Sequence, residues 1–317
     1  MKRRTFIENA ALGSMALGFS SFSHDKSITP LDQPIPKRVL GKTGEQLSVI
    51  GFGGIMLNGN SQEFANEQVS KAFNAGVNYF DVAPSYGNAI SKLGPALKPY
   101  RKDCFLACKT TERTAEGALK ELNESLEGMQ TDHFDLYQLH ALSSTDEVEK
   151  VFAPGGAMEV FLNARQQGKV RFLGFSAHSE DAALLAMKKF NFDTILFPIN
   201  FNCWHHGNFG PRAFAEARSK GMGILALKAM AMSLLKTGEA KLYKNVWYRP
   251  MQDNEMASLA LRYTLSKEIT AAIPPGDSEF FWEAMETAKN FKSITQEETD
   301  RLLAFVGDNT PVFSNKA

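Results

Sequence analysis

The sequence predicts an α/β protein folded as a (β/α)8 TIM barrel, and three observations support this fold class. Eight short apolar runs alternate with segments whose apolar residues recur at helical spacing, which is typical of a parallel sheet with helical crossovers. Eight strands close into a barrel of about 250 residues, and the chain has 317. An open dinucleotide-binding sheet would need a GxGxxG turn that opens a helix, and GFGG at residues 51–54 lacks that spacing.

The strand candidates are too short for typical helices and are rich in β-forming or aliphatic residues. In chain order they are residues 47–52, 77–82, 104–109, 134–140, 170–176, 194–199, 223–228 and 270–274. Helical segments follow the strands at residues 66–74, 114–126, 156–167, 181–190, 211–220 and 255–266. Two further helices at residues 278–290 and 296–305 close the chain.

The N-terminus has the order of an export signal. Basic residues at 2–4 precede a run at 9–23 that carries no charge and is rich in small and apolar residues. The arginine pair resembles a twin-arginine signal, and the run is too short and too rich in Ser and Gly to span a membrane. We therefore expect a signal peptide over residues 1–23, a linker over 24–37 and one barrel domain over 38–317. A cytoplasmic protein with a basic N-terminus is the alternative.

Charge and cysteine content exclude several classes of protein. The 35 basic and 35 acidic residues balance, which gives no support to a nucleic-acid partner. Cys104, Cys108 and Cys203 are odd in number, and the first two would lie about 13 Å apart on one strand, too far for a disulfide. We expect buried cysteines with no disulfide framework.

Polar residues end three successive predicted strands. Asp81, Lys109 and His140 stand at the ends of these strands, and Tyr86 follows on the loop after the first of them. Because the active site of a barrel lies at the carboxyl ends of its strands, we expect the four side chains at one mouth. A lysine ammonium lowers the pKa of a neighbouring tyrosine, and an aspartate keeps the buried lysine charged. The set predicts a general acid that protonates an alkoxide forming at a carbonyl, with the histidine bonded to the substrate oxygen.

Longer stretches around these residues resemble the signatures of the aldo-keto reductase family. They are RVLGKTGEQLSVIGFGG (38–54), FDVAPSYGN (80–88), FLACKT (105–110), TDHFDLYQLH (131–140) and GKVRFLGFSAHS (168–179). The match keeps the family's order from Arg38 to about Ala288, and the PYRKDCFLACKT wording with the N-terminal signal resembles an exported bacterial branch.

The resemblance implies a nicotinamide cofactor extended across the strand ends and hydride transfer to an aldehyde or ketone. It makes Tyr86 the proton donor, with Lys109 tuning it, Asp81 pairing with Lys109, and His140 orienting the carbonyl. The implied cofactor contacts are Gly53, Gly54, Ile55, Met56, Ser176, Asn200, Leu227, Lys228, Pro274, Gly276, Asp277 and Glu283.

The cofactor positions match less closely than the four catalytic ones. Where the family commonly has Ser-Asn, Ser176 is followed by Ala177, and Leu227 stands where an aromatic ring usually stacks on the nicotinamide. After the eighth strand, many members place Arg or Lys against the 2′-phosphate of NADP. This chain reads IPPGDSEFFWE (273–283), whose carboxylates would repel a phosphate unless Asp277 only caps the helix. The family favours NADP and the local residues favour NAD; we expect NADP, with NAD as the alternative.

Aromatic residues on two loops are candidates for the substrate pocket. Trp204 and Trp247 could line it or pack a lid, and the adjacent His205 and His206 lack a third ligand, so we expect no metal site. The sequence predicts an exported aldo-keto reductase that acts on a small carbonyl compound and uses the twin-arginine export machinery. Two other functions stay open: a non-catalytic NADP-binding sensor or accessory subunit, and a dehydrogenase that oxidises an alcohol or sugar.

Overall fold

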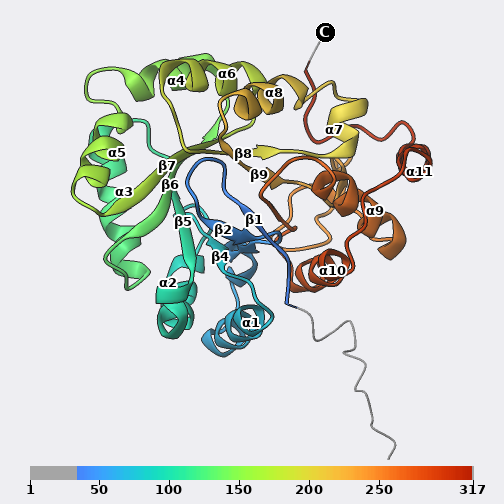
Figure 1. Ribbon diagram of the computed structural model, residues 1–317, viewed down its shortest axis with the longest axis horizontal. Helices are drawn as coiled ribbons and strands as arrows, with labels where there is room; N and C mark the ends of the chain where they lie inside the picture. The colour runs from blue at the N-terminus through green and yellow to red at the C-terminus, as the bar shows by residue number, and fades with distance from the viewer. Residues whose placement is uncertain (1–33, 316–317) are drawn as a thin grey trace, which may run out of the picture.

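Eight parallel strands form a barrel in the computed structural model, which describes residues 34–315 (Figure 1). Each strand pairs with its neighbour in chain order, and a parallel bridge between Ile50 and Ala272 joins the two edges. The predicted (β/α)8 TIM barrel is confirmed. The barrel strands are β3 (Phe52–Gly53), β4 (Tyr79–Asp81), β5 (Phe105–Thr110), β6 (Phe134–Leu142), β7 (Val170–Ala177), β8 (Thr194–Pro198), β9 (Gly223–Leu227) and β12 (Ala271–Ile273).

Helices surround the sheet on its outer side (Figure 1). They are α1 (Gln62–Asn74), α2 (Ala89–Leu97), α3 (Ala115–Gly128), α4 (Thr145–Phe152), α5 (Ala157–Gln166), α6 (Glu180–Lys189), α7 (Phe201–His205), α8 (Pro211–Ser219), α9 (Asn254–Leu265), α10 (Ser278–Lys289) and α11 (Gln296–Val306), with 3-10 turns η2 (Gly54–Leu57) and η3 (Lys98–Asp103). Their apolar faces pack on the strands and form the larger of two buried clusters. Within residues 34–315, no helix is long and apolar enough to cross a membrane.

The first predicted strand, residues 47–52, is divided between two structures. Its beginning belongs to β2 (Gln46–Ser48), which pairs antiparallel with β1 (Lys37–Val39), and only its last residue enters the barrel. Leu40 and Leu47 of this hairpin join the cluster inside the barrel, so the hairpin seals the amino end of the strands. Lys37, which the sequence assigned to the linker, therefore begins an ordered hairpin.

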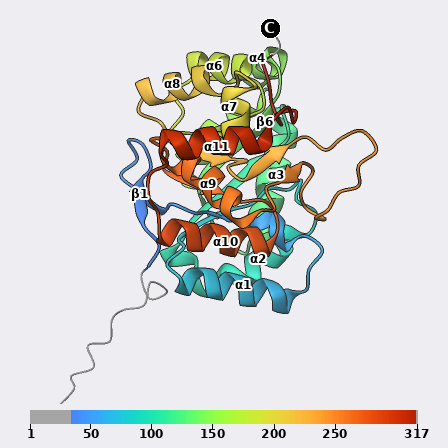
Figure 2. The same ribbon diagram turned by 90° about the vertical axis from the view of Figure 1, so that its right-hand side faces the viewer.

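The two ends of the barrel carry different segments. In Figure 2 the β1–β2 hairpin lies at one end, and the long loop between β10 (Ala231–Ser233) and β11 (Arg249–Pro250), coloured orange, projects at the other. This second end holds the carboxyl ends of the strands, where a barrel places its chemistry. The predicted signal at residues 1–23 and the linker up to residue 33 lie outside the described residues.

Candidate active site

A buried ion pair stands at the carboxyl ends of β4 and β5. Lys109 Nζ pairs with Asp81 Oδ1, and the two side chains are 0% and 2% exposed. The ammonium also donates to the Val82 carbonyl at 3.2 Å. Asp81 Oδ2 accepts hydrogen bonds of 3.3 Å from the Tyr79 hydroxyl and from Gln138 Nε2. Both oxygens of the carboxylate are thus used, which makes this buried charge tolerable and fixes the lysine in one place.

Tyr86 lies over this pair, on the turn between β4 and α2. Its ring centroid is 5.1 Å from Lys109 Nζ, and it meets the ring of His140 edge-on at 5.7 Å. The amide of Tyr86 donates to the Ala83 carbonyl, and its own carbonyl accepts from Ala89, so the backbone of this turn is held in place. The structure therefore brings the four predicted catalytic side chains together.

The charges of this group set the protonation of Lys109 and Tyr86. Burial alone would lower the pKa of Lys109, but the Asp81 carboxylate raises it above its ordinary value. Burial raises the pKa of the Tyr86 phenol, and the Lys109 ammonium opposes that effect without overcoming it. The sequence predicted a lowered tyrosine pKa; the structure differs because partial burial of the ring outweighs the effect of the ammonium. Tyr86 therefore keeps its proton near neutral pH.

His140 is held neutral beside the tyrosine. Burial, followed by the charge of Lys109, lowers its pKa well below the usual value. Its Nδ1 lies 3.3 Å from the Ser85 hydroxyl, and its carbonyl accepts from the Arg113 guanidinium at 2.7 Å. A neutral imidazole has one N–H, so it can donate to a substrate oxygen without adding charge to the site.

Two residues missed by the sequence reasoning support the catalytic group. Gln138 and Tyr79 hold the Asp81 carboxylate from inside the barrel. Each lies two residues before a catalytic residue on the same strand, and alternate strand residues face the same side. That period of two is the signal that could have identified them.

The predicted contacts for the nicotinamide end are Ser176, Asn200, Leu227 and Lys228, which lie at or just beyond the carboxyl ends of β7, β8 and β9. The Ser176 hydroxyl accepts from the Ala141 amide at 2.7 Å beside His140, and Leu227 is half-buried at the end of β9. Asn200, which stays a predicted cofactor contact, also makes hydrogen bonds within the protein. Its amide donates to the carbonyls of Lys228 and Ala231, and its oxygen caps α7 by accepting from Cys203. Its polar atoms are occupied in joining β8 to the segment after β9.

The predicted contacts at the other end of the cofactor lie around η2 and α10. Gly53 and Gly54 are buried where β3 ends, and η2 continues through Ile55 and Met56. Gly276 is packed so closely that a Cβ would lie 2.9 Å from Ile55 Cγ2 and 2.9 Å from the Asn245 carbonyl. Pro274 and Asp277 lead into α10, which Asp277 caps by accepting from the Glu279 amide at 3.0 Å.

A buried carboxylate oxygen of Glu283 without a hydrogen-bond partner indicates which groups this end could bind. Glu283 Oε1 is buried and has no hydrogen-bond partner among residues 34–315. Burial, with a contribution from Asp253, raises the pKa of Glu283 to about 7. Glu283 lines a cavity of about 270 Å³ together with Tyr243, Gln252, Asn254, Glu279 and Phe280. Ribose hydroxyls are donors that would satisfy this oxygen, so the residues fit a nicotinamide dinucleotide, while the carboxylate opposes an added 2′-phosphate.

The two tryptophans predicted near the substrate lie in different places. Trp204 packs against Phe214 of α8, with Lys267 Nζ 4.2 Å above its ring, on the helical layer outside the barrel. Trp247 is 42% exposed and contacts Phe313, whose tilted ring lies 4.9 Å from that of His178 just beyond β7. Only Trp247 therefore stays a candidate for the mouth.

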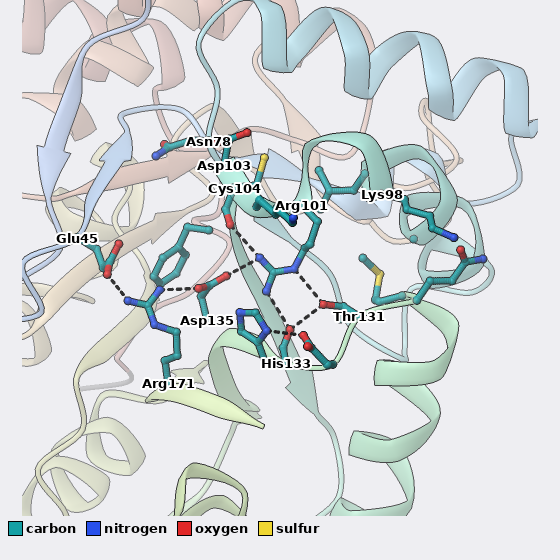
Figure 3. A pocket seen from close by; sticks show the side chains of 17 residues that line it. Glu45, Asn78, Lys98, Arg101, Asp103, Cys104, Thr131, His133, Asp135 and Arg171 are labelled. Atoms are coloured by element: carbon teal, nitrogen blue, oxygen red, sulfur yellow. Dashed lines mark hydrogen bonds and ion pairs between the residues drawn. The ribbon is translucent and has the colours of Figure 1, made fainter. Parts of the chain in front are cut away.

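A cavity of about 800 Å³ lies at the opposite end of the barrel, beside the amino ends of β5 and β6 (Figure 3). There Arg171 pairs with both Glu45 and Asp135, and Arg101 pairs with Asp135 and donates to two backbone carbonyls. Because these guanidinium groups are already satisfied by the protein, the network braces the amino end of the barrel, and we place no chemistry there.

Comparison with known proteins gives a family and a fold. The model of the Aldo/keto reductase family matches residues 49–302. L-galactose dehydrogenase from Arabidopsis thaliana is 26% identical over 84% of this chain and 90% of its own. The 6-dehydroglucose reductase from Novosphingobium aromaticivorans is 29% identical over 56% of this chain and 65% of its own. A holo-form aldo-keto reductase from Bacillus halodurans shares the fold, with a TM-score of 0.66 at 22% identity over 88% of this chain and 98% of its own.

Proposed function

Because the chain belongs to the aldo/keto reductase family, we propose that it reduces an aldehyde or ketone to an alcohol with a nicotinamide cofactor and that Tyr86 is the general acid. One observation carries the proposal. Tyr86 lies between the Lys109 ammonium, 5.1 Å from its ring, and the neutral His140 ring. A proton donor, a cation and a hydrogen-bond donor thus lie close together at the barrel mouth. A carbonyl oxygen bound there would be protonated by the first and stabilised by the other two.

A nicotinamide cofactor, when bound at the mouth, would supply the hydride for the carbonyl carbon. Tyr86 then transfers its phenolic proton to the carbonyl oxygen, on which negative charge develops. The Lys109 ammonium stabilises the phenolate that remains, and Asp81 keeps Lys109 charged in its buried position. His140 donates its N–H to the same oxygen and fixes the angle of the carbonyl.

The cofactor preference is the finer part of the proposal. The family leads us to expect NADP. At low pH the carboxyl group of Glu283 is protonated and would not repel the 2′-phosphate of NADP. Ionised Glu283 works against that phosphate, so the preference depends on pH, as argued in the Discussion. The sugar in the name of L-galactose dehydrogenase is a substrate of that protein, so the substrate class proposed below is argued from the residues at the mouth instead.

We also propose that the chain belongs to an exported branch of the family and reaches the periplasm through the twin-arginine pathway. The support is the pair Arg3 and Arg4 ahead of an uncharged run.

The variant Tyr86→Phe tests the mechanism because it removes the proton and keeps the ring. We expect kcat to fall at least a hundredfold with any aldehyde that the wild type reduces, as general acids contribute about 10²–10⁴ in rate. The dissociation constant of the reduced cofactor, measured by fluorescence, should stay within threefold.

Tyr100→Phe is the matched control. Its hydroxyl donates to Ser70 on the outer helical layer, so the same atom is lost far from the mouth, and turnover should be unchanged. Undiminished turnover in Tyr86→Phe would exclude Tyr86 as the acid. Cofactor binding without turnover of any aldehyde by the wild type would favour the sensor function instead.

A further inference from the structure

One lysine at the barrel mouth is held in an unfavourable backbone conformation. Lys228 follows the last residue of β9 and has φ +65°, in the left-handed region that residues with a Cβ rarely adopt. Its carbonyl accepts from Asn200 Nδ2 at 2.8 Å and from the Ala231 amide at 2.9 Å, which fixes this conformation. Strained residues of this kind persist where the surrounding structure holds them and cluster at functional sites.

The ammonium of Lys228 has aromatic neighbours and no carboxylate partner. Its Nζ lies 5.1 Å from the ring centroid of Trp247 and 5.0 Å from that of Tyr248. Among the residues that the structure describes, no Asp or Glu forms an ion pair with it. Cation–π contacts offset part of the loss of water around the charge, but they leave it without a counter-ion.

The other ionisable groups that face Lys228 do not neutralise it. They are Lys109, His140, His178 and Cys203, whose charges interact with that of Lys228. Lys109 is already paired with Asp81, both histidine pKa values are lowered, that of His178 to about 4, and the thiol pKa of Cys203 is raised to about 11. Near neutral pH the mouth therefore holds one uncompensated positive charge.

We propose that Lys228 binds a carboxylate of the substrate, so that the protein selects carbonyl compounds carrying an acid group over neutral analogues of the same shape. The inference rests on the proposed function and deepens it by naming the substrate class. An anionic oxygen is the natural partner of an unpaired ammonium. It could come from a substrate carboxylate or from the diphosphate of the cofactor. The substrate is favoured over the cofactor's diphosphate because the charge of Lys228 acts on His140 and His178, across the mouth at the ends of β6 and β7.

Protonation of Lys228 gives the binding a defined pH dependence. Burial, with repulsion from Lys109, lowers its pKa to about 8, although Cys203 opposes the shift. The ammonium is therefore present below pH 8 and is lost as the pH rises through that value. The KM for an acid substrate should rise over this range, while the KM for a neutral substrate should not follow it.

A matched pair of aldehydes tests the proposal: 4-carboxybenzaldehyde and its methyl ester, which has a similar shape without the charge. The wild type should prefer the acid in kcat/KM. Lys228→Met removes the charge and should lower the acid-to-ester ratio at least tenfold, whereas Lys228→Arg should keep most of it. Lys241→Met, an exposed lysine on the long loop between β10 and β11, is the control and should leave the ratio unchanged.

Binding measurements separate the two sources of the anion. Fluorescence gives two dissociation constants for the wild type and for Lys228→Met. One is that of benzoate on cofactor-loaded protein, and the other is that of the reduced cofactor itself. Benzoate binding weakened tenfold, with cofactor binding within threefold, supports the proposal. Cofactor binding weakened tenfold with an unchanged acid-to-ester ratio assigns Lys228 to the diphosphate and overturns it. If the wild type reduces the ester and shows no preference for the acid, this inference is overturned and the proposed function stands. If the wild type binds benzoate through Lys228 but reduces neither aldehyde, only the proposed function is contradicted.

Discussion

Asp81 and Lys109 are stable in the barrel only as a pair. Both are buried, and each satisfies the charge of the other. Lys109→Met would leave an unpaired carboxylate in the interior, and we expect the free energy of unfolding at pH 7 to fall by about 3–5 kcal/mol. Urea unfolding of the purified protein measures this change.

The double variant Asp81→Asn/Lys109→Met gives the control for that loss. With neither charge present, most of the lost stability should return, while catalysis should not, because Tyr86 loses the cation that stabilises its phenolate. A single variant that loses less than about 1 kcal/mol would show that water reaches the pair and that the site is less enclosed than its burial indicates.

The convergence of the four proposed catalytic residues could be predicted because parallel strands in a barrel end at the same mouth, so strand-end residues meet whatever their separation in sequence. Their energetic balance could not. Whether burial or Lys109 dominates the pKa of Tyr86 depends on how far the ring is withdrawn from water, which tertiary packing decides. The capping of α7 by Asn200 could not be predicted for a similar reason, since it depends on the position of the loop after β8.

At the scale of elements, the strands were predicted well and the short helices poorly. The eight apolar runs match the barrel strands, apart from residues 47–52, where one apolar run begins in the hairpin strand β2 and ends in β3. The helix α2 contains Gly94 and Pro95, which disfavour a helix on propensity. Tertiary packing explains the glycine, because a Cβ on Gly94 would lie 2.4 Å from the Gly128 carbonyl at the end of α3.

Glu283 of α10 lies where we propose that the adenosine end of the cofactor binds. The pKa of Glu283 is raised to about 7 by burial, so its carboxylate form increases as the pH rises through 7. If the 2′-phosphate of NADPH lies there, its binding should weaken over that range. Glu283→Gln removes the titration, and we expect NADPH to bind at least threefold tighter than to the wild type at pH 8.5 and equally well at pH 5.5.

Fluorescence titration with NADPH and NADH at the two pH values checks this expectation. NADH lacks the phosphate and should respond less to the substitution. Glu286→Gln, on the exposed side of the same helix, controls for a general change in surface charge. An equal response of both cofactors to Glu283→Gln would place the phosphate elsewhere.

For the whole molecule, the closure of the barrel makes folding depend on both ends of the chain. The sheet is joined only when β12 meets the backbone around Ile50, a parallel contact across more than two hundred residues. All three cysteines are buried as free thiols, and burial raises the thiol pKa of Cys104 to about 12. The fold therefore needs no disulfide, which is consistent with the proposed export of an already folded protein.

The proposed export route gives a prediction for the whole chain. Replacing Arg3 and Arg4 by Lys keeps the positive charge but removes the arginine pair on which recognition depends. In a bacterium that carries the twin-arginine machinery, we expect the wild-type protein in the periplasmic fraction, shortened at its N-terminus, and the double variant in the cytoplasm at full length. Lys26→Gln, beyond the predicted signal, is the control and should be exported normally. Export of the double variant at the wild-type level would show that these arginines are not an address and that the basic N-terminus has another role.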